Sequence, residues 1–179
     1  MGLWPPLAIL TILFIDKAFD WSRHGLLSAA IADATAHLLT ALLLLVAIPR
    51  RMPPYFIIGA LSAALLIDLD HLPLVLGSDL LTRQTGRPVT HAIWTIALPF
   101  ILAVATHNRL RFVLFGVSFG LIAHFARDLA STSAGVPLLW PIITHSFTIP
   151  FGAYVALMFA CWAAFAWQGR SHFHLTAER

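Results

Sequence analysis

The chain has 179 residues, about the length of one domain, and 59% of them are hydrophobic while only 11% are charged. Soluble domains have about a quarter of their residues charged, so this composition excludes an ordinary soluble protein. The net charge of +3 is not gathered into a basic stripe, and we infer no nucleic-acid partner. The sequence therefore predicts an integral membrane protein.

Apolar segments follow one another along the whole chain. A transmembrane helix needs about 20 mostly apolar residues. Five segments reach that length, and a shorter one near the N-terminus ends at Asp16 and Lys17; in chain order the six are 3–15, 25–48, 54–77, 89–106, 112–131 and 146–167. We expect an all-α bundle of about six transmembrane helices, with a single transmembrane domain over residues 1–168 and a cytoplasmic tail over residues 169–179.

Basic residues predict the orientation, because they are enriched in cytoplasmic loops. With six spans, the bases at one side of the membrane are Arg50, Arg51, Arg109, Arg111, Arg170 and Arg179. The bases at the other side are Lys17, Arg23, Arg83 and Arg87. The first group is larger and contains tight pairs, so we predict a multi-pass protein with both termini in the cytoplasm.

Acidic residues and histidines occur inside or at the edge of the apolar segments, at Asp33, Asp68, Asp70, Asp128, His37, His71, His91 and His124. An ionisable side chain in hydrocarbon costs several kcal/mol, so such residues normally pair, line a cavity or bind an ion. One such histidine is readily explained as a hydrogen-bond donor between helices. This number of them in neighbouring spans predicts a common site.

Spacing places four of these residues on helix faces. Asp33 and His37 are four residues apart, as are His124 and Asp128, so each pair shares one face of a helix. The two spans run in opposite directions and the two pairs have opposite order. In each pair the aspartate is therefore nearer the outer surface of the membrane than the histidine. The two pairs can meet in the outer half of the membrane.

The tetrad Asp68-Leu69-Asp70-His71 precedes Pro73. In a regular helix Asp70 points about 160° away from Asp68, whereas His71 shares the face of Asp68. Pro73 removes a backbone hydrogen bond, and an unwound turn there can direct all three side chains into one cavity. The alternative is an ordinary helix that ends at the proline.

Imidazoles and carboxylates without thiolates favour a divalent metal, with zinc ahead of manganese or iron. The predicted ligands exceed what one tetrahedral ion requires, so we expect one or two ions; they are His37, Asp68, His71, His91, His124 and Asp128. We expect Asp70 and Asp33 to be the catalytic carboxylates. For Asp70 we consider two roles, a general base and a group that orients a metal ligand.

Four motifs occur in the order Asp-Leu-Asp-His (68–71), Gly-Arg-Pro-Val-Thr-His (86–91), His-Phe-Ala-Arg-Asp (124–128) and Gly-Val-Pro-Leu-Leu-Trp-Pro (135–141). Together they resemble the YdjM-type family of bacterial inner-membrane proteins, which are described as metal-dependent hydrolases. The resemblance implies an inner-membrane location and functional roles for the predicted ligands, Asp70 and Arg87. The chain departs from the family pattern at Gly86, Pro88 and Ala92, and Gly86 replaces a histidine that is a potential ligand.

Two arginines are candidates for binding an anionic headgroup, because a guanidinium binds phosphate or carboxylate with two hydrogen bonds. These are Arg87 and Arg127; the alternatives are an interfacial position for Arg87 and a structural ion pair for Arg127. We predict a membrane-embedded, metal-dependent hydrolase that uses metal-activated water on a lipid-like ester or phosphoester from the outer leaflet.

Two other functions stay open at this point. Rows of aspartate and histidine also form metal or proton transport paths, although the inner halves of these spans carry no charge. A non-enzymatic membrane subunit that binds haem through His37 and His124 is the second alternative. The oligomeric state is not predicted by any of these patterns.

Overall fold

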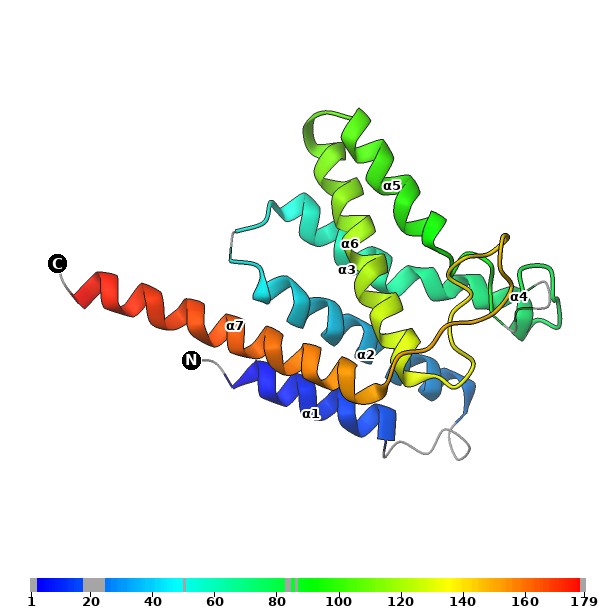
Figure 1. Ribbon diagram of the computed structural model, residues 1–179, viewed down its shortest axis with the longest axis horizontal. Coiled ribbons are helices and arrows are strands. Elements are labelled where there is room, and N and C mark those ends of the chain that lie inside the picture. The colour runs from blue at the N-terminus through cyan, green and yellow to red at the C-terminus, as the bar shows by residue number, and fades with distance from the viewer. Residues whose placement is uncertain (1–2, 18–24, 50, 83–84, 86, 178–179) are drawn as a thin grey trace. The chain divides into compact units, whose positions relative to one another are not determined.

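The protein is described by a computed structural model that covers residues 3–17, 25–49, 51–82, 85 and 87–177, with side chains up to residue 169. Five residues that carry predictions lie outside the described residues: Arg23, Arg50, Arg83, Arg179 and Gly86. Arg170 is described by its backbone alone. The described chain is helical, without a β-strand, so the predicted all-α fold class is confirmed (Figure 1).

The helices form two compact units. One comprises Met1–Arg51 with Val155–Arg179, and the other is the continuous segment Met52–Tyr154. The predicted single domain over residues 1–168 stays a prediction. The first unit holds α1 (Trp4–Lys17), α2 (Leu26–Ala47) and most of α7 (Phe151–Ala177).

In the first unit, α1 packs on α2 and contacts α7, and α7 is also bonded to α2. Trp4 meets Phe165 of α7 edge to face, with ring centroids 6.0 Å apart. The side chain of Gln168 donates a hydrogen bond of 3.0 Å to the carbonyl of Ala47, near the end of α2. The last carbonyls of a helix have no partner within the helix, and this bond satisfies one of them.

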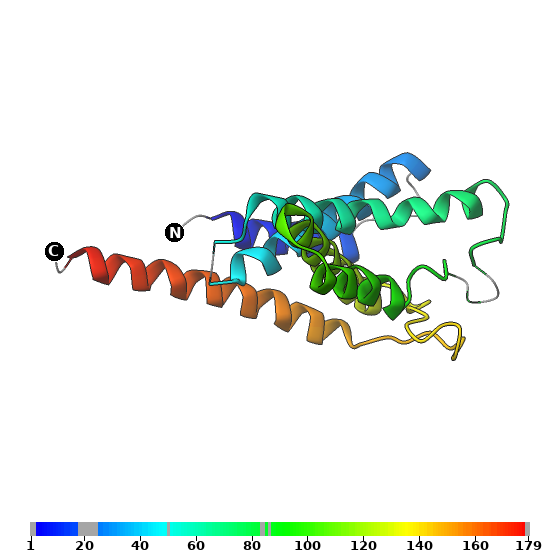
Figure 2. The ribbon, with the colours of Figure 1, turned by 90° about the horizontal axis from the view of Figure 1, so that it is seen from above.

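The second unit holds α3 (Pro54–Leu66), the short 3-10 helix η2 (Ile67–His71), α4 (Leu72–Val75), α5 (Ile93–Ala105) and α6 (Asn108–Ser131). α5 and α6 form an antiparallel hairpin, and α6 also packs along α3 (Figure 1). Figure 2 shows the long connection that leads from α4 to the start of α5.

Small residues let the backbones of α3 and α6 approach closely. A Cβ atom at Gly116 or Gly120 would fall on a backbone carbonyl of α3, and a Cβ at Gly59 would fall on that of Val113. Glycines four residues apart commonly allow such contact between membrane helices, where packing rather than water exclusion drives association. Close packing of α3 on α6 fixes the distance between the polar residues that these elements carry.

The chain changes from α-helix to 3-10 helix just before Pro73. Proline has no N–H and cannot donate to the carbonyl of Leu69, which weakens the regular helix there. The change occurs where the sequence predicted an unwound turn. It places Asp68, Asp70 and His71 on a tighter turn than an α-helix provides.

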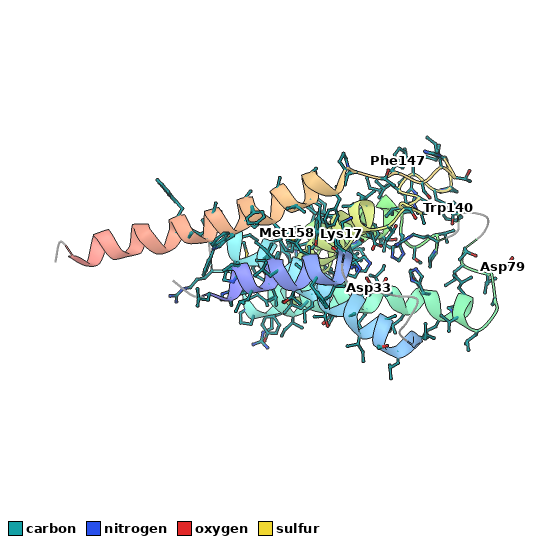
Figure 3. All side chains as sticks on the ribbon, turned by 90° about the horizontal axis from the view of Figure 1, so that it is seen from below. Lys17, Asp33, Asp79, Trp140, Phe147 and Met158 are labelled. Carbon is teal, nitrogen blue, oxygen red and sulfur yellow. The ribbon has the colours of Figure 1, made fainter. Side chains whose placement is uncertain are left out.

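The loop after α6 is fixed to α5 and α6 by backbone and side-chain hydrogen bonds. Val136 and Phe147 pair through two backbone bonds of 2.9 and 2.8 Å, and the backbone N–H of Ile93 donates to Leu138 over 2.8 Å. Trp94 donates from Nε1 to the carbonyl of Trp140 over 2.5 Å. Figure 3 labels Trp140 and Phe147 in this loop.

Four helical segments of the described chain are long and apolar enough to cross a membrane: Leu26–Ala47, Pro54–Val75, Asn108–Ser131 and Phe151–Gly169. Two of the six predicted spans are shorter helices. α1 has 14 residues and α5 has 13. At 1.5 Å per residue each covers about 20 Å, less than the roughly 30 Å of hydrocarbon. α5 begins at Ile93 rather than near residue 89, and α7 continues to Ala177 through most of the predicted tail.

Candidate metal centre

Six of the predicted site residues lie together in the Met52–Tyr154 unit. They come from three places in the chain: η2 carries Asp68, Asp70 and His71, the segment before α5 carries His91, and α6 carries His124 and Asp128. His91, His124 and Asp128 are buried, whereas His71 and Asp68 keep 31% and 29% of their side-chain surface exposed. The cluster therefore has a buried side and an accessible side.

His124 is held by α3 and directed at two carboxylates. Its Nδ1 lies 2.9 Å from the carbonyl oxygen of Ala64. A carbonyl oxygen accepts only, so Nδ1 carries a proton and donates it. Nε2 then lies 3.3 Å from Oδ1 of Asp68 and 3.4 Å from Oδ2 of Asp128. A neutral imidazole would present a lone pair to these two carboxylates, whereas an imidazolium would present a second N–H to them.

His91 occupies the middle of the cluster. Its ring lies 5.2 Å from the ring of His71 and 5.4 Å from that of His124, centroid to centroid. Phe125 stacks on it at 5.3 Å with an interplanar angle of 19°, which restricts the rotation of the imidazole. Nε2 of His91 lies 3.5 Å from Oδ2 of Asp128, within reach of a common ion.

Asp70 lies between two imidazoles. Its Oδ1 is 2.8 Å from Nδ1 of His71, and its Oδ2 is 3.1 Å from Nδ1 of His91. The hydroxyl of Thr90 donates to the same Oδ2. A carboxylate on the outer nitrogen of a ligating histidine fixes the orientation of its ring. Of the two roles predicted for Asp70, this position favours the ligand-orienting one.

Arg87 forms an ion pair with Asp128. Its Nη1 donates to Oδ2 of Asp128, and the two side chains are 13% and 4% exposed. Arg87 therefore offsets one of the three carboxylate charges in the cluster. It has a partner at the site instead of the purely interfacial position that was its alternative, and its predicted contact with a substrate headgroup stays a prediction.

The donor set fits a divalent cation. Among the described residues of this unit, ligand atoms of Asp68, His71 and His91 lie within 4.8 Å of one another, and so do those of His91, His124 and Asp128. Nε2 of His91 is buried without a hydrogen bond of acceptable geometry, although oxygens of Asp68 and Asp128 lie 3.7 and 3.5 Å from it. Atoms that surround a cation point at the cation and not at each other, which is the pattern seen here.

Three other predicted site residues, Asp33, His37 and Arg127, come from α2 and α6. Asp33 and His37 belong to the first unit, where Oδ2 of Asp33 is 3.8 Å from Nε2 of the buried His37, and their contribution to the cluster stays a prediction. Arg127 lies on α6 and is 2% exposed. His145 is exposed in the loop after α6 and stands apart from the ligand groups of this unit.

Sequence reasoning missed three contributors to the site. Thr90 was recognised in a motif without receiving a role, yet its hydroxyl contacts Asp70. Phe125 and the carbonyl of Ala64 orient two of the histidines. Thr90 could have been found as the hydroxyl next to His91, whereas an apolar ring and a backbone carbonyl carry no distinctive signal.

A comparison with models of protein families gives a match over most of the chain. The model of a family described as YdjM inner membrane protein matches residues 20–177, which is most of the chain. Searches of curated proteins and of solved structures found no match.

Proposed function

The chain belongs to the YdjM inner membrane protein family, and from that premise we propose that it is a metal-dependent hydrolase acting on a lipid-like ester or phosphoester at the outer leaflet. The protein is an inner-membrane protein whose second unit carries a cluster of histidines and aspartates. The reaction, the metal and the substrate are the proposed parts.

The observation that carries this proposal is the environment of His124. Because Nδ1 donates to the carbonyl of Ala64, Nε2 faces Asp68 and Asp128 either as a lone pair or as a second protonated nitrogen. In the first state the three groups together would be able to hold a cation. A histidine whose outer N–H is fixed by a carbonyl is the usual arrangement of a metal ligand.

The residues that would hold the ion are His71, His91, His124, Asp68 and Asp128. A divalent ion in such a site supplies an acidified water as nucleophile and positive charge for the developing oxyanion. Zinc fits best, since the donors are nitrogen and carboxylate oxygen, with manganese and iron as the other candidates.

The chain itself supplies the remaining chemistry. Asp70 holds the imidazoles of His71 and His91 and is in turn held by Thr90. The partly exposed Asp68 and His71 form the side that a substrate can reach. The apolar helices around the site favour a substrate that is itself in the membrane, which supports a lipid over a water-soluble ester.

Metal content and hydrolysis test this proposal together. Purified wild-type protein should contain a divalent metal and hydrolyse a lipid ester or phosphoester, and a chelator should abolish that activity. His124→Ala should lose the metal, because removal of a ligand opens the coordination sphere. His145→Ala, the same change at an exposed histidine outside the cluster, should retain metal and activity. Wild-type protein that binds no divalent metal would exclude the hydrolase.

Asp70→Asn separates the two roles of this carboxylate. If Asp70 orients ligands, metal affinity should fall by about 10–100-fold. A general base would instead leave the metal bound while activity falls by roughly 10²–10⁴. Metal titration of the variant beside its turnover distinguishes these results, and the contacts of Asp70 favour the first.

A further inference from the structure

An apolar groove of about 400 Å³ runs between three helices of the second unit. It is lined by Ala63, Leu66 and Ile67 from α3 and η2, by Thr95, Leu98, Pro99 and Leu102 from α5, and by Val117 and Leu121 from α6. Among these lining residues Thr95 has the polar side chain, and its hydroxyl already donates to the carbonyl of Thr90. The groove thus presents a hydrocarbon surface to any occupant.

The groove and the metal centre share one face of α6. Val117, Leu121, His124 and Asp128 are spaced by four, three and four residues, so they form a single stripe along the helix. The first two line the groove and the last two belong to the cluster. An occupant that follows this stripe reaches the cluster about one helical turn beyond Leu121.

The other two walls also continue into the centre. Ile67 lines the groove and directly precedes Asp68. On α5, Thr95 bonds to Thr90, whose hydroxyl bonds to the carboxylate of Asp70. All three walls therefore change from apolar to ionisable at the same end of the groove.

We propose that this groove holds one unbranched acyl chain of a membrane lipid, whose ester or phosphoester bond then lies at the metal centre. A chain in hydrocarbon needs no polar partner, and the lining offers none. The headgroup end needs cationic or metal partners, and the cluster lies at the end where the walls become polar. The volume lies within the range of about 300–1,000 Å³ that is typical of small-molecule sites. This assignment rests on the proposed function and adds the substrate class, a lipid bearing a long acyl chain.

Photolabelling tests the occupant without requiring turnover. The full-length protein is placed in phospholipid vesicles that contain phosphatidylglycerol with a diazirine near the end of one acyl chain. After irradiation, labels should concentrate on peptides that contain Leu102 and Val117. Leu98→Trp should reduce that labelling several-fold, because the indole fills the groove from the lipid side. Val104→Trp is the matched control, since Val104 and Leu98 are 59% and 60% exposed on α5 and Val104 does not line the groove.

Kinetics give the second readout. Leu98→Trp should raise KM for a long-chain lipid substrate several-fold relative to Val104→Trp, and the increase should be smaller for a butyryl analogue, whose chain is too short to fill the groove. The acyl-chain assignment of the groove would be overturned by labelling that is spread evenly over the lipid-facing residues, or by labelling that is unchanged in Leu98→Trp. Neither result would contradict metal-dependent hydrolysis. If the groove is labelled but the protein hydrolyses no lipid, the proposed function is overturned. The bound acyl chain would then not belong to a substrate.

Discussion

Gly120→Ala tests whether the close packing of α3 on α6 sets the geometry of the site. A Cβ at this position would overlap the carbonyl oxygen of Ala60 and lie 2.8 Å from its carbonyl carbon, whereas ordinary contact begins near 3.4 Å. The two backbones must therefore separate by at least about 0.6 Å, since neither is a flexible side chain. Overpacking of this kind costs about 1–3 kcal/mol, which lowers the thermal midpoint by about 2–12 °C in a chain of this size.

The same displacement should reach the metal centre. Gly120 and His124 are one helical turn apart on α6, and Ala60 and Ala64 are one turn apart on α3. Separation at Ala60 therefore lengthens the bond from His124 to the carbonyl of Ala64. We expect metal affinity to fall by about 10–100-fold, as for other losses of ligand orientation.

The assay is thermal unfolding in detergent with and without metal, together with a metal titration. Gly152→Ala is the matched control because a Cβ there meets nothing within 4 Å. It should unfold at the wild-type temperature or slightly above, since alanine favours helix over glycine by up to about 1 kcal/mol. A Gly120→Ala protein with wild-type midpoint and wild-type metal affinity would refute the argument.

Three further predictions concern the cluster and its place in the membrane. Thr90→Val should reduce metal affinity or turnover by about 10–100-fold, and Thr90→Ser should restore it, because only the hydroxyl contacts Asp70. Arg87→Ala should destabilise the metal-free protein by about 3–5 kcal/mol, since Asp128 then loses its arginine partner in a buried site; added zinc should recover part of that loss in a thermal unfolding assay. A protease site at the C-terminus should be cut in inside-out vesicles and not in intact spheroplasts, and the reverse result would contradict the predicted orientation.

The clustering of the aspartates and histidines was predictable in part, because it involves residue types that are unusual in apolar segments. Aspartate and histidine are rare in apolar segments, so Asp68, His91 and His124 stand out without any knowledge of the fold. The position of Pro73 likewise indicated an interrupted helix, and the structure has η2 there. The Gly116 and Gly120 spacing was present in the sequence as well, although its partner helix was not apparent from it.

Contacts between distant segments were not predictable in the same way. Arg87 pairs with Asp128 across 41 residues, and no local pattern indicates which acid an arginine in a loop will meet. The start of α5 was predicted about four residues too early. Hydropathy carries no information on the contacts of Thr90 and His91 with the cluster, nor on the backbone hydrogen bond from Ile93 to Leu138. The apolar composition of residues 89–106 predicted a helix over that whole segment. Polar tertiary contacts before Ile93 make the observed helix α5 shorter.

The most direct measurement of the central claim is X-ray absorption spectroscopy at the zinc edge on the zinc-loaded, full-length protein. The centre described here predicts nitrogen and oxygen ligands at about 2.0–2.2 Å, with the multiple-scattering signature of at least two imidazoles and no sulfur. His145→Ala should give the same spectrum, and His124→Ala should lose the bound zinc. A spectrum with a sulfur ligand, or without imidazole, would contradict a metal centre built from His71, His91, His124, Asp68 and Asp128.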